Sequence, residues 1–282
     1  MISIIICSRT KSLKETFKKN IEDTIGCEYE LIVIDNSQNK YSIFEAYNSG
    51  IEKSSGEYLC FIHDDILMHT IGWGTKLQEI FNENEEIGLI GVAGTKIKTK
   101  MPSAWWECPK NKTAVNIIQH HKVKEKEIIY HGFDSNDLIE VAVVDGVFIA
   151  IRNKDELKFN DELKGFHNYD IDISLKCIEK GYKVYVTNQL LIEHFSSGTV
   201  NEKWVKSTFD FYKLNKDKLP INVGSNKLDT KLENLNAIRF ITNAVEFKKH
   251  KIAYTIWLKL LFTAPFLKFH LQFLKSKLKK IF

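Results

Sequence analysis

Four short apolar runs occur in the first hundred residues, and longer segments of mixed polarity separate them. The runs are rich in β-branched and aromatic residues, which predicts that they form strands. They occupy residues 1–7, 31–35, 57–62 and 88–94.

The segments between these runs carry helix signals. Ser12 with Glu15, and Ser42 with Glu45, have the spacing of a capping box. Helices are therefore predicted to begin at Ser12 and Ser42, and a third is predicted at about 73–82. Strands that alternate with such helices predict an α/β fold, with a parallel sheet covered on both faces. Sheets of this kind bind ligands beyond the carboxyl ends of their strands.

The pattern is less regular in the second hundred residues. Residues 95–138 contain two prolines and three histidines and are predicted to form a long functional or mobile loop. His120, His121 and His131 have no ligand-like neighbours in the sequence and are predicted to lie on the surface. Further strands are predicted at 139–151, 183–187 and 189–193, and helices at 170–180 and from 202 onward.

Composition narrows the class of protein. Apolar residues make up 44% and charged residues 27% of the 282 residues, as in an ordinary globular protein with a sizeable core. The five cysteines are far apart and form no CxxC pair, which excludes a zinc ribbon and argues for a reducing compartment. We expect neither a secretory signal nor a membrane span, because no apolar stretch reaches the required length.

Charge is distributed unevenly along the chain. The 40 Lys and Arg and 36 Asp and Glu residues give a net charge of +4. Residues 246–282 hold nine lysines and one glutamate (+8), so residues 1–245 carry 31 − 35 = −4. A nucleic-acid-binding protein would spread basic charge over its folded face, so we expect no nucleic-acid partner. The basic tail instead favours an anionic membrane surface.

The tail has the pattern of two amphipathic helices broken at Pro265. In the second helix, Lys268, Lys275 and Lys279 share one stripe, with leucines and Ile281 roughly opposite. A helix of this kind can lie in the interface of a bilayer. The alternative is a helix that packs on the rest of the chain or on a second subunit of a homo-oligomer.

Polar residues follow each of the first three predicted strands. Because the carboxyl ends of parallel strands meet at one edge of a sheet, we expect these residues to share one rim. The alternative is ordinary polar loop chemistry. The residues are Ser8 and Arg9, then Asp35, Asn36 and Ser37, then His63, Asp64 and Asp65.

The adjacent carboxylates Asp64 and Asp65 repel each other unless a cation lies close to them. Mg²⁺ or Mn²⁺ prefers such oxygen ligands and is often held this way beside substrate phosphates. The two carboxylates therefore suggest a divalent-metal site, with a solvated loop as the alternative.

The segment NSGIEKSSGEYLCFIHDDI (48–66) resembles the core of the family-2 type glycosyltransferases. His63-Asp64-Asp65 stands in the place of that family's DxD motif, with His63 replacing the first aspartate. Further segments resemble the family in the right order over about residues 1–200. They are IIICSRT, LIVIDNSQN, DGVFIAIRNK, FHNYDIDISLKCIEKGYKVYV and IEHFSSGT.

The resemblance implies a GT-A fold, a Rossmann-like αβα sandwich that binds a nucleotide sugar. It implies that Asp65 binds a metal that bridges the donor phosphates, and that Asp64 lies near the donor ribose and sugar. His194 is implied at the metal or the diphosphate, with an ordinary structural histidine as the alternative. The remaining donor contacts are implied at Ser8, Arg9, Asp35 and Asn36, the last two facing uracil or an equivalent base.

The resemblance also implies a general base at Asp170, in the place of the family's Glu-Asp motif, with Tyr169 replacing the glutamate. A carboxylate there would deprotonate the acceptor hydroxyl as it attacks the donor sugar. Asp172 lies about 200° around the helix from Asp170 and is expected to point elsewhere. Trp105 and Trp106 could stack on a sugar of the acceptor, and the alternative is that they pack beneath their own loop.

We therefore expect a GT-A glycosyltransferase domain over residues 1–220 and a helical, basic, membrane-associating extension over 221–282. The expected activity is inverting, Mn²⁺- or Mg²⁺-assisted sugar transfer from a nucleotide-diphosphate donor to a glycan or lipid-linked acceptor. The expected location is the cytoplasmic face of a membrane. The alternatives are a non-catalytic nucleotide- or sugar-binding scaffold and, less favoured because no glycine-rich loop follows the first strand, a sugar nucleotidyltransferase.

Overall fold

The computed structural model describes residues 1–121, 125–196, 198–225 and 227–278. Lys279 and Ile281 of the two stripes expected in the tail lie outside the described residues.

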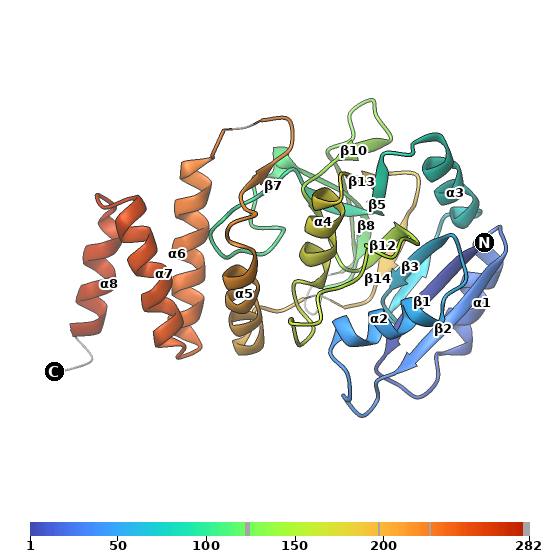
Figure 1. The fold of residues 1–282 in the computed structure, drawn as a ribbon, viewed down its shortest axis with the longest axis horizontal. Helices are drawn as coiled ribbons and strands as arrows, with labels where there is room; N and C mark the ends of the chain where they lie inside the picture. Colours follow the sequence, from blue (N-terminus) through green and yellow to red (C-terminus); the bar gives the residue numbers. More distant parts are fainter. Residues whose placement is uncertain (122–124, 197, 226, 279–282) are drawn as a thin grey trace.

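A seven-stranded sheet lies on the right of Figure 1, with the carboxyl-terminal helices on the left. Strand β1 pairs in parallel with both β2 and β3, and β13 pairs in parallel with β5. Strand β12 is antiparallel to β3 and β5, and β10 is antiparallel to β13, so five of the seven strands point one way. The order across the sheet is β10 (Leu138–Glu140), β13 (Lys183–Thr187), β5 (Ile87–Gly91), β12 (Phe148–Arg152), β3 (Tyr58–Ile62), β1 (Ile2–Ser8) and β2 (Tyr29–Asp35).

Helices cover both faces of this sheet, which confirms the α/β prediction. Alternate side chains of β1 point to opposite faces, so Ile5 belongs to one apolar cluster and Ile4 and Ile6 to the other. The first cluster contains apolar residues of α2 (Ile43–Lys53) and α4 (Tyr169–Glu179). The second contains apolar residues of α3 (Trp73–Glu83) and of α1 (Glu15–Thr24).

The two predicted capping boxes have different outcomes. At α2 the Ser42 backbone donates to Glu45 Oε2 at 2.9 Å and the Ser42 side chain accepts from the Glu45 backbone, as predicted. At α1 the prediction is wrong, because the helix begins at Glu15 without a side-chain cap. Glu15 instead pairs with Lys18 at 2.8 Å, and the Ser12 carbonyl accepts from the Thr10 hydroxyl.

The segment 95–138, predicted as a long loop, contains the strands β8 (Thr113–Gln119) and β9 (Glu127–His131), which belong to a second sheet of six strands. The chain passes from one sheet to the other inside two apolar runs, at Val92 and over 141–147, so each predicted strand there is in fact divided. The strand predicted at 189–193 is shifted to Ile192–His194. The sheet contains β11 (Val143–Val144), β6 (Ala93–Thr95), β8 (Thr113–Gln119), β14 (Ile192–His194), β4 (Ile66–Met68) and β9 (Glu127–His131).

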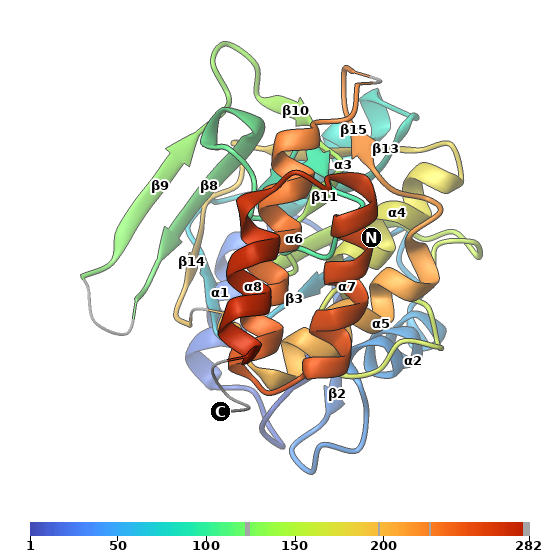
Figure 2. The same ribbon diagram turned by 90° about the vertical axis from the view of Figure 1, so that its left-hand side faces the viewer.

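Four helices form the carboxyl-terminal part of the described chain (Figure 2). They share an apolar cluster that includes Trp204, Phe240 and Trp257, together with Met101 and Ala104 of the segment after β7 (Ile97–Lys98). The short strand β15 (Ile221–Asn222) pairs with β7. The helices are α5 (Glu202–Asn215), α6 (Thr230–Glu246), α7 (His250–Thr263) and α8 (Lys268–Leu278).

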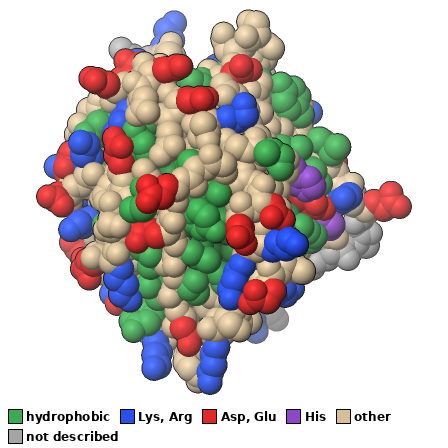
Figure 3. Space-filling model, turned by 90° about the vertical axis from the view of Figure 1, so that its right-hand side faces the viewer, with side chains coloured by type: hydrophobic (Ala, Val, Ile, Leu, Met, Phe, Trp, Pro, Cys, Tyr) green, Lys and Arg blue, Asp and Glu red, His purple; other side chains and the backbone are tan. Residues whose placement is uncertain are grey.

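The predicted break at Pro265 is confirmed, since it lies between α7 and α8. Within the described part of the chain, no helix combines the length and apolarity needed to cross a bilayer. On the face of the molecule shown in Figure 3, acidic and basic side chains are interspersed and no large patch of one sign is visible.

Glu193, a carboxylate buried on β14, holds together the edges of the second sheet. It accepts hydrogen bonds from His120 Nε2 at 2.6 Å, His69 Nε2 at 2.8 Å and Lys126 Nζ at 3.1 Å. His120 is therefore a structural partner and not the free surface histidine that the sequence predicts. The hydrogen bond from His120, with those from His69 and Lys126, lowers the pKa of Glu193 to about 2.

We predict that Glu193→Gln removes a pH-dependent part of the stability. A lowered carboxylate pKa stabilises the fold fully above the ordinary value near 4.5, and this contribution is lost as the pH falls toward 2. The wild type should exceed the variant by about 2 kcal/mol near pH 6, with the difference shrinking below pH 4.5. Urea unfolding at several pH values measures this, and a constant difference would contradict it.

Candidate active site

The three polar strand ends meet at one rim, as the parallel order of β1, β2 and β3 requires. Arg9, Asn36, His63 and the two aspartates after it line one cavity of about 200 Å³. Not every residue of these groups reaches it. Ser8 is buried and its hydroxyl donates to the Thr10 carbonyl at 2.9 Å.

At the end of β2, Asn36 lines the cavity and Asp35 does not. Asp35 is exposed and accepts from the Ser37 backbone N–H at 2.9 Å, outside the residues that line the cavity. The Asn36 side chain closes the turn that follows: it donates to the Tyr41 carbonyl at 2.9 Å and accepts from the Tyr41 N–H at 3.0 Å.

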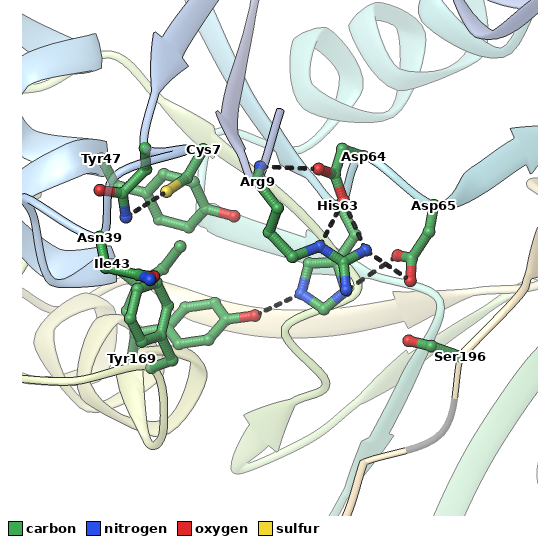
Figure 4. A pocket seen from close by; sticks show the side chains of 12 residues that line it. Cys7, Arg9, Asn39, Ile43, Tyr47, His63, Asp64, Asp65, Tyr169 and Ser196 are labelled. Carbon is green, nitrogen blue, oxygen red and sulfur yellow. Dashed lines mark hydrogen bonds and ion pairs between the residues drawn. The ribbon is translucent and has the colours of Figure 1, made fainter. Parts of the chain in front are cut away.

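Arg9 is the cation that the adjacent carboxylates require in this structure (Figure 4). Its backbone N–H donates to Asp64 Oδ2 at 2.9 Å, and its Nη2 donates to Asp64 Oδ1 at 2.8 Å. The same Nη2 lies 3.0 Å from Asp65 Oδ2. One guanidinium therefore bridges both carboxylates and offsets their repulsion.

The second oxygen of Asp65 faces two imidazoles. Asp65 Oδ1 is buried without a hydrogen-bond partner among the described atoms, and it lies 3.7 Å from both His63 Nδ1 and His194 Nε2. One ligand atom from each of these three residues lies within 4.8 Å of the other two. Burial lowers the pKa of both histidines, so both imidazoles are neutral near pH 7. A carboxylate and two neutral imidazoles form a donor set that fits a divalent cation.

A second cavity, of about 470 Å³, adjoins the first, and His63 and Tyr169 line both of them. Asp170, at the start of α4, lines the second cavity together with Asp145, Trp105 and Trp106. Burial, reinforced by the charge of Asp145, raises the pKa of Asp170 to about 7. Asp170 can therefore exchange a proton near neutral pH.

Asp172 points away from this cavity, as its helical spacing predicts. It is buried and accepts from the Asn160 backbone N–H at 2.9 Å. The expectation that the two aspartates of α4 cannot serve one site therefore agrees with their hydrogen bonds and surroundings.

Sequence reasoning missed two residues of the site. Asp145, which precedes the strand β12, lines the cavity of Asp170 and accepts from the Val147 N–H at 2.8 Å. The sequence marks Tyr169 only as a departure from the family pattern, yet its hydroxyl lies 2.7 Å from His63 Nε2. The DG pair at 145–146 and the replacement at 169 were the available signals, but neither indicates a contact with another segment.

A family model described as "Glycosyltransferase like family" matches residues 3–220. No curated protein matches the chain.

Solved structures similar to this chain share little sequence with it. TarS 1–349 of S. aureus, in complex with UDP-GlcNAc, is 11% identical with a TM-score of 0.49, covering 87% of this chain and 73% of that one. GalNAc-T7 with UDP, GalNAc and Mn²⁺ is 12% identical with a TM-score of 0.49, covering 86% and 54%. A197 from STIV is 17% identical with a TM-score of 0.38, covering 70% and 86%.

We predict that Gly146→Ala destabilises the protein. A Cβ at this position would lie 2.2 Å from the Tyr169 hydroxyl, so the tyrosine ring must move. Overpacking of this kind typically costs about 1–3 kcal/mol, measurable by urea unfolding. Gly198→Ala is the control, because a Cβ there meets no atom within 4 Å. Equal stability of the two variants would show that the ring moves without cost.

Proposed function

The chain belongs to the glycosyltransferase-like family, and we propose that it transfers a sugar from a nucleotide-diphosphate donor to an acceptor hydroxyl with inversion. This proposal rests on one observation: two neighbouring cavities share a wall. Arg9, Asp64 and Asp65 line one cavity and Asp170 lines the other. His63 and Tyr169 line both cavities.

The smaller cavity is proposed to take the donor nucleotide. Asn36, Tyr47 and Cys7 line one part of it, at the ends of β1 and β2 and on α2, and can contact a base. Arg9 lines the other part and can bind phosphate oxygens once it leaves the carboxylates. Ser8 and Asp35 remain proposed donor contacts from the resemblance, although neither lines the cavity. Uracil is the first base to test.

Asp65 and His194 are proposed to hold Mn²⁺ or Mg²⁺ at the diphosphate. A bound divalent ion would stabilise negative charge on the leaving diphosphate. The support for this assignment is the buried Asp65 Oδ1, which has no hydrogen-bond partner among the described atoms and faces His194 Nε2. Asp64, held by Arg9, is proposed to lie beside the donor ribose and sugar.

Asp170 is proposed to act as the general base. Its carboxylate accepts the proton of the acceptor hydroxyl while the hydroxyl oxygen forms a bond to the anomeric carbon and the bond from that carbon to the diphosphate breaks. One base and a single displacement give inversion at the anomeric carbon. A pKa of about 7 suits this role, because the group is substantially ionised near neutral pH and still basic enough to accept a proton.

The larger cavity is proposed to take a glycan or lipid-linked saccharide. Trp105 and Trp106 line it, their rings nearly perpendicular at 89° with centroids 6.0 Å apart. Two indole faces set at a right angle can contact a sugar ring on two sides.

We predict that Asp170→Asn lowers the release of nucleoside diphosphate from a nucleotide sugar by about 10²–10⁴-fold, because the amide cannot accept the proton. In the wild type the rate should rise with pH through about 7, since the base works only when ionised. Activity measured over a panel of nucleotide sugars, UDP-sugars first, gives both results.

The control for this prediction is donor binding, which Asp170→Asn should leave intact. A ligand at 100 times its dissociation constant adds about 2.7 kcal/mol of stability, visible as a thermal shift. If the variant keeps both binding and turnover, Asp170 is not the base. If the wild type binds UDP but releases no diphosphate from any sugar donor, the scaffold alternative holds.

The outer face of the last two helices is proposed to lie on the cytoplasmic surface of an anionic membrane. Phe262 and Phe266, around the turn between α7 and α8, are 84% and 98% exposed, and Leu271 is 65% exposed. Lys268 and Lys275 are exposed on the same helix as Leu271. Apolar side chains can enter the interface while each nearby lysine contributes about 1 kcal/mol with anionic lipid.

We predict that the double change Phe262→Ser and Phe266→Ser weakens binding to phosphatidylglycerol–phosphatidylcholine vesicles by more than tenfold, since a fully buried Phe contributes about 1.5–3 kcal/mol. Deleting 251–282 is a poorer test, because Ile256 and Leu260 belong to the core of the helical part.

Ile128→Ser is the matched control for vesicle sedimentation, because Ile128 is 70% exposed on β9 and should not affect binding. Unchanged binding by the double variant would refute the membrane proposal. A change in sedimentation coefficient of the protein alone would instead assign this face to a second copy of the chain.

A further inference from the structure

Two residues that depart from the family pattern, His63 and Tyr169, are hydrogen-bonded to each other (Figure 4). The Tyr169 hydroxyl also lies 3.1 Å from the Gly146 carbonyl oxygen, and a carbonyl can only accept. The single phenol proton is therefore directed to Gly146, and the phenol oxygen accepts from His63 Nε2–H at 2.7 Å. In a neutral imidazole this leaves the lone pair on Nδ1, the atom that faces Asp65 Oδ1 at 3.7 Å.

Gln119 determines the hydrogen position on the second imidazole in the same way. Its side-chain nitrogen donates to the carbonyls of His120 at 2.8 Å and Ser196 at 2.7 Å, which fixes the orientation of the amide. Its oxygen therefore faces His194 Nδ1 at 3.1 Å and accepts from it. The lone pair of His194 is then on Nε2, which lies 3.7 Å from the same Asp65 Oδ1.

Two imidazole lone pairs and one carboxylate oxygen thus converge, and the Ser196 hydroxyl, 3.3 Å from His194 Nε2, can donate its single proton to only one of them. Such an arrangement is repulsive on its own and becomes favourable when a cation binds at its centre. Arg9 does not fill this role, because its contact is with the other carboxylate oxygen, Asp65 Oδ2.

We propose that His63 is a third metal ligand through Nδ1, and that Tyr169 and Gln119 are positioning residues that present His63 and His194 to the ion. Neighbours that hold the second ring nitrogen of a ligating histidine fix its tautomer and orientation. Two nitrogen ligands and one oxygen ligand favour Mn²⁺ or another transition-metal ion over Mg²⁺, which prefers oxygen. This inference rests on the metal site of the proposed function and adds its third ligand and its selectivity.

The test measures Mn²⁺ binding to the full chain without any nucleotide. Binding is monitored through the loss of the electron paramagnetic resonance signal of free Mn²⁺. Tyr169→Phe, Gln119→Leu and His63→Ala should each weaken binding by about 10–100-fold. Tyr58→Phe is the matched control, because it removes a buried phenol at the opposite end of β3 and should leave the affinity unchanged. In competition, Mg²⁺ should displace little Mn²⁺ from the wild type and markedly more from His63→Asp.

A second measurement does not depend on metal affinity. Long-range ¹⁵N–¹H correlation spectra of the metal-free protein should show His63 protonated at Nε2 in the wild type and a mixture of tautomers in Tyr169→Phe, whose ring still packs against Tyr47 and Phe159. Wild-type protonation at Nδ1 would overturn the assignment.

Failure of the inference can be told from failure of the proposed function. If Asp65→Ala and His194→Ala abolish Mn²⁺ binding while His63→Ala and Tyr169→Phe do not, the proposed metal site stands and the third ligand is wrong. If the wild type binds no Mn²⁺, both metal assignments fail, and the test of Asp170 as the base remains independent of them.

Discussion

The site depends on one strand, β1, which is hydrogen-bonded on both sides and buried on both faces. Ile2, Ile4, Ile5 and Ile6 have no exposed surface, and the strand pairs in parallel with β2 and β3. A strand held in this way has a single register, because a shift by one residue would exchange the side chains that face the two cores. The polar residues after β1, β2 and β3 must therefore end at the same rim. The cavity there follows from the packing of isoleucines rather than from the polar residues themselves.

The sequence permitted prediction of those features that rest on local patterns. The parallel strands, the capping box at Ser42, the break at Pro265 and the opposite directions of Asp170 and Asp172 each follow from a period or a spacing within one segment. The convergence of three strand ends on one cavity was also predictable, because topology alone brings them together.

The remaining features were not predictable because they depend on contacts between distant segments. Nothing near Val92 marks the point at which the chain leaves one sheet for the other, since both environments are apolar. The pairing of His63 with Tyr169 joins residues that are 106 positions apart. The Arg9 bridge to Asp64 likewise requires two strand ends to be placed side by side. The sequence therefore indicated the need for a cation and suggested a divalent metal ion, but gave no sign that Arg9 would contact both carboxylates.

The carboxyl-terminal helices also support one wall of the larger cavity. Glu233 on α6 is buried and accepts from the backbone N–H groups of Lys100 at 2.6 Å and Met101 at 2.8 Å. Asn236, one turn along, donates to Thr99 Oγ1 at 3.1 Å. These bonds fix the start of the segment that carries Trp105 and Trp106 into the larger cavity. Helix α6 also packs against α7, and Met101 and Ala104 belong to the apolar cluster of the helical part, so the helices and this wall of the larger cavity share one core.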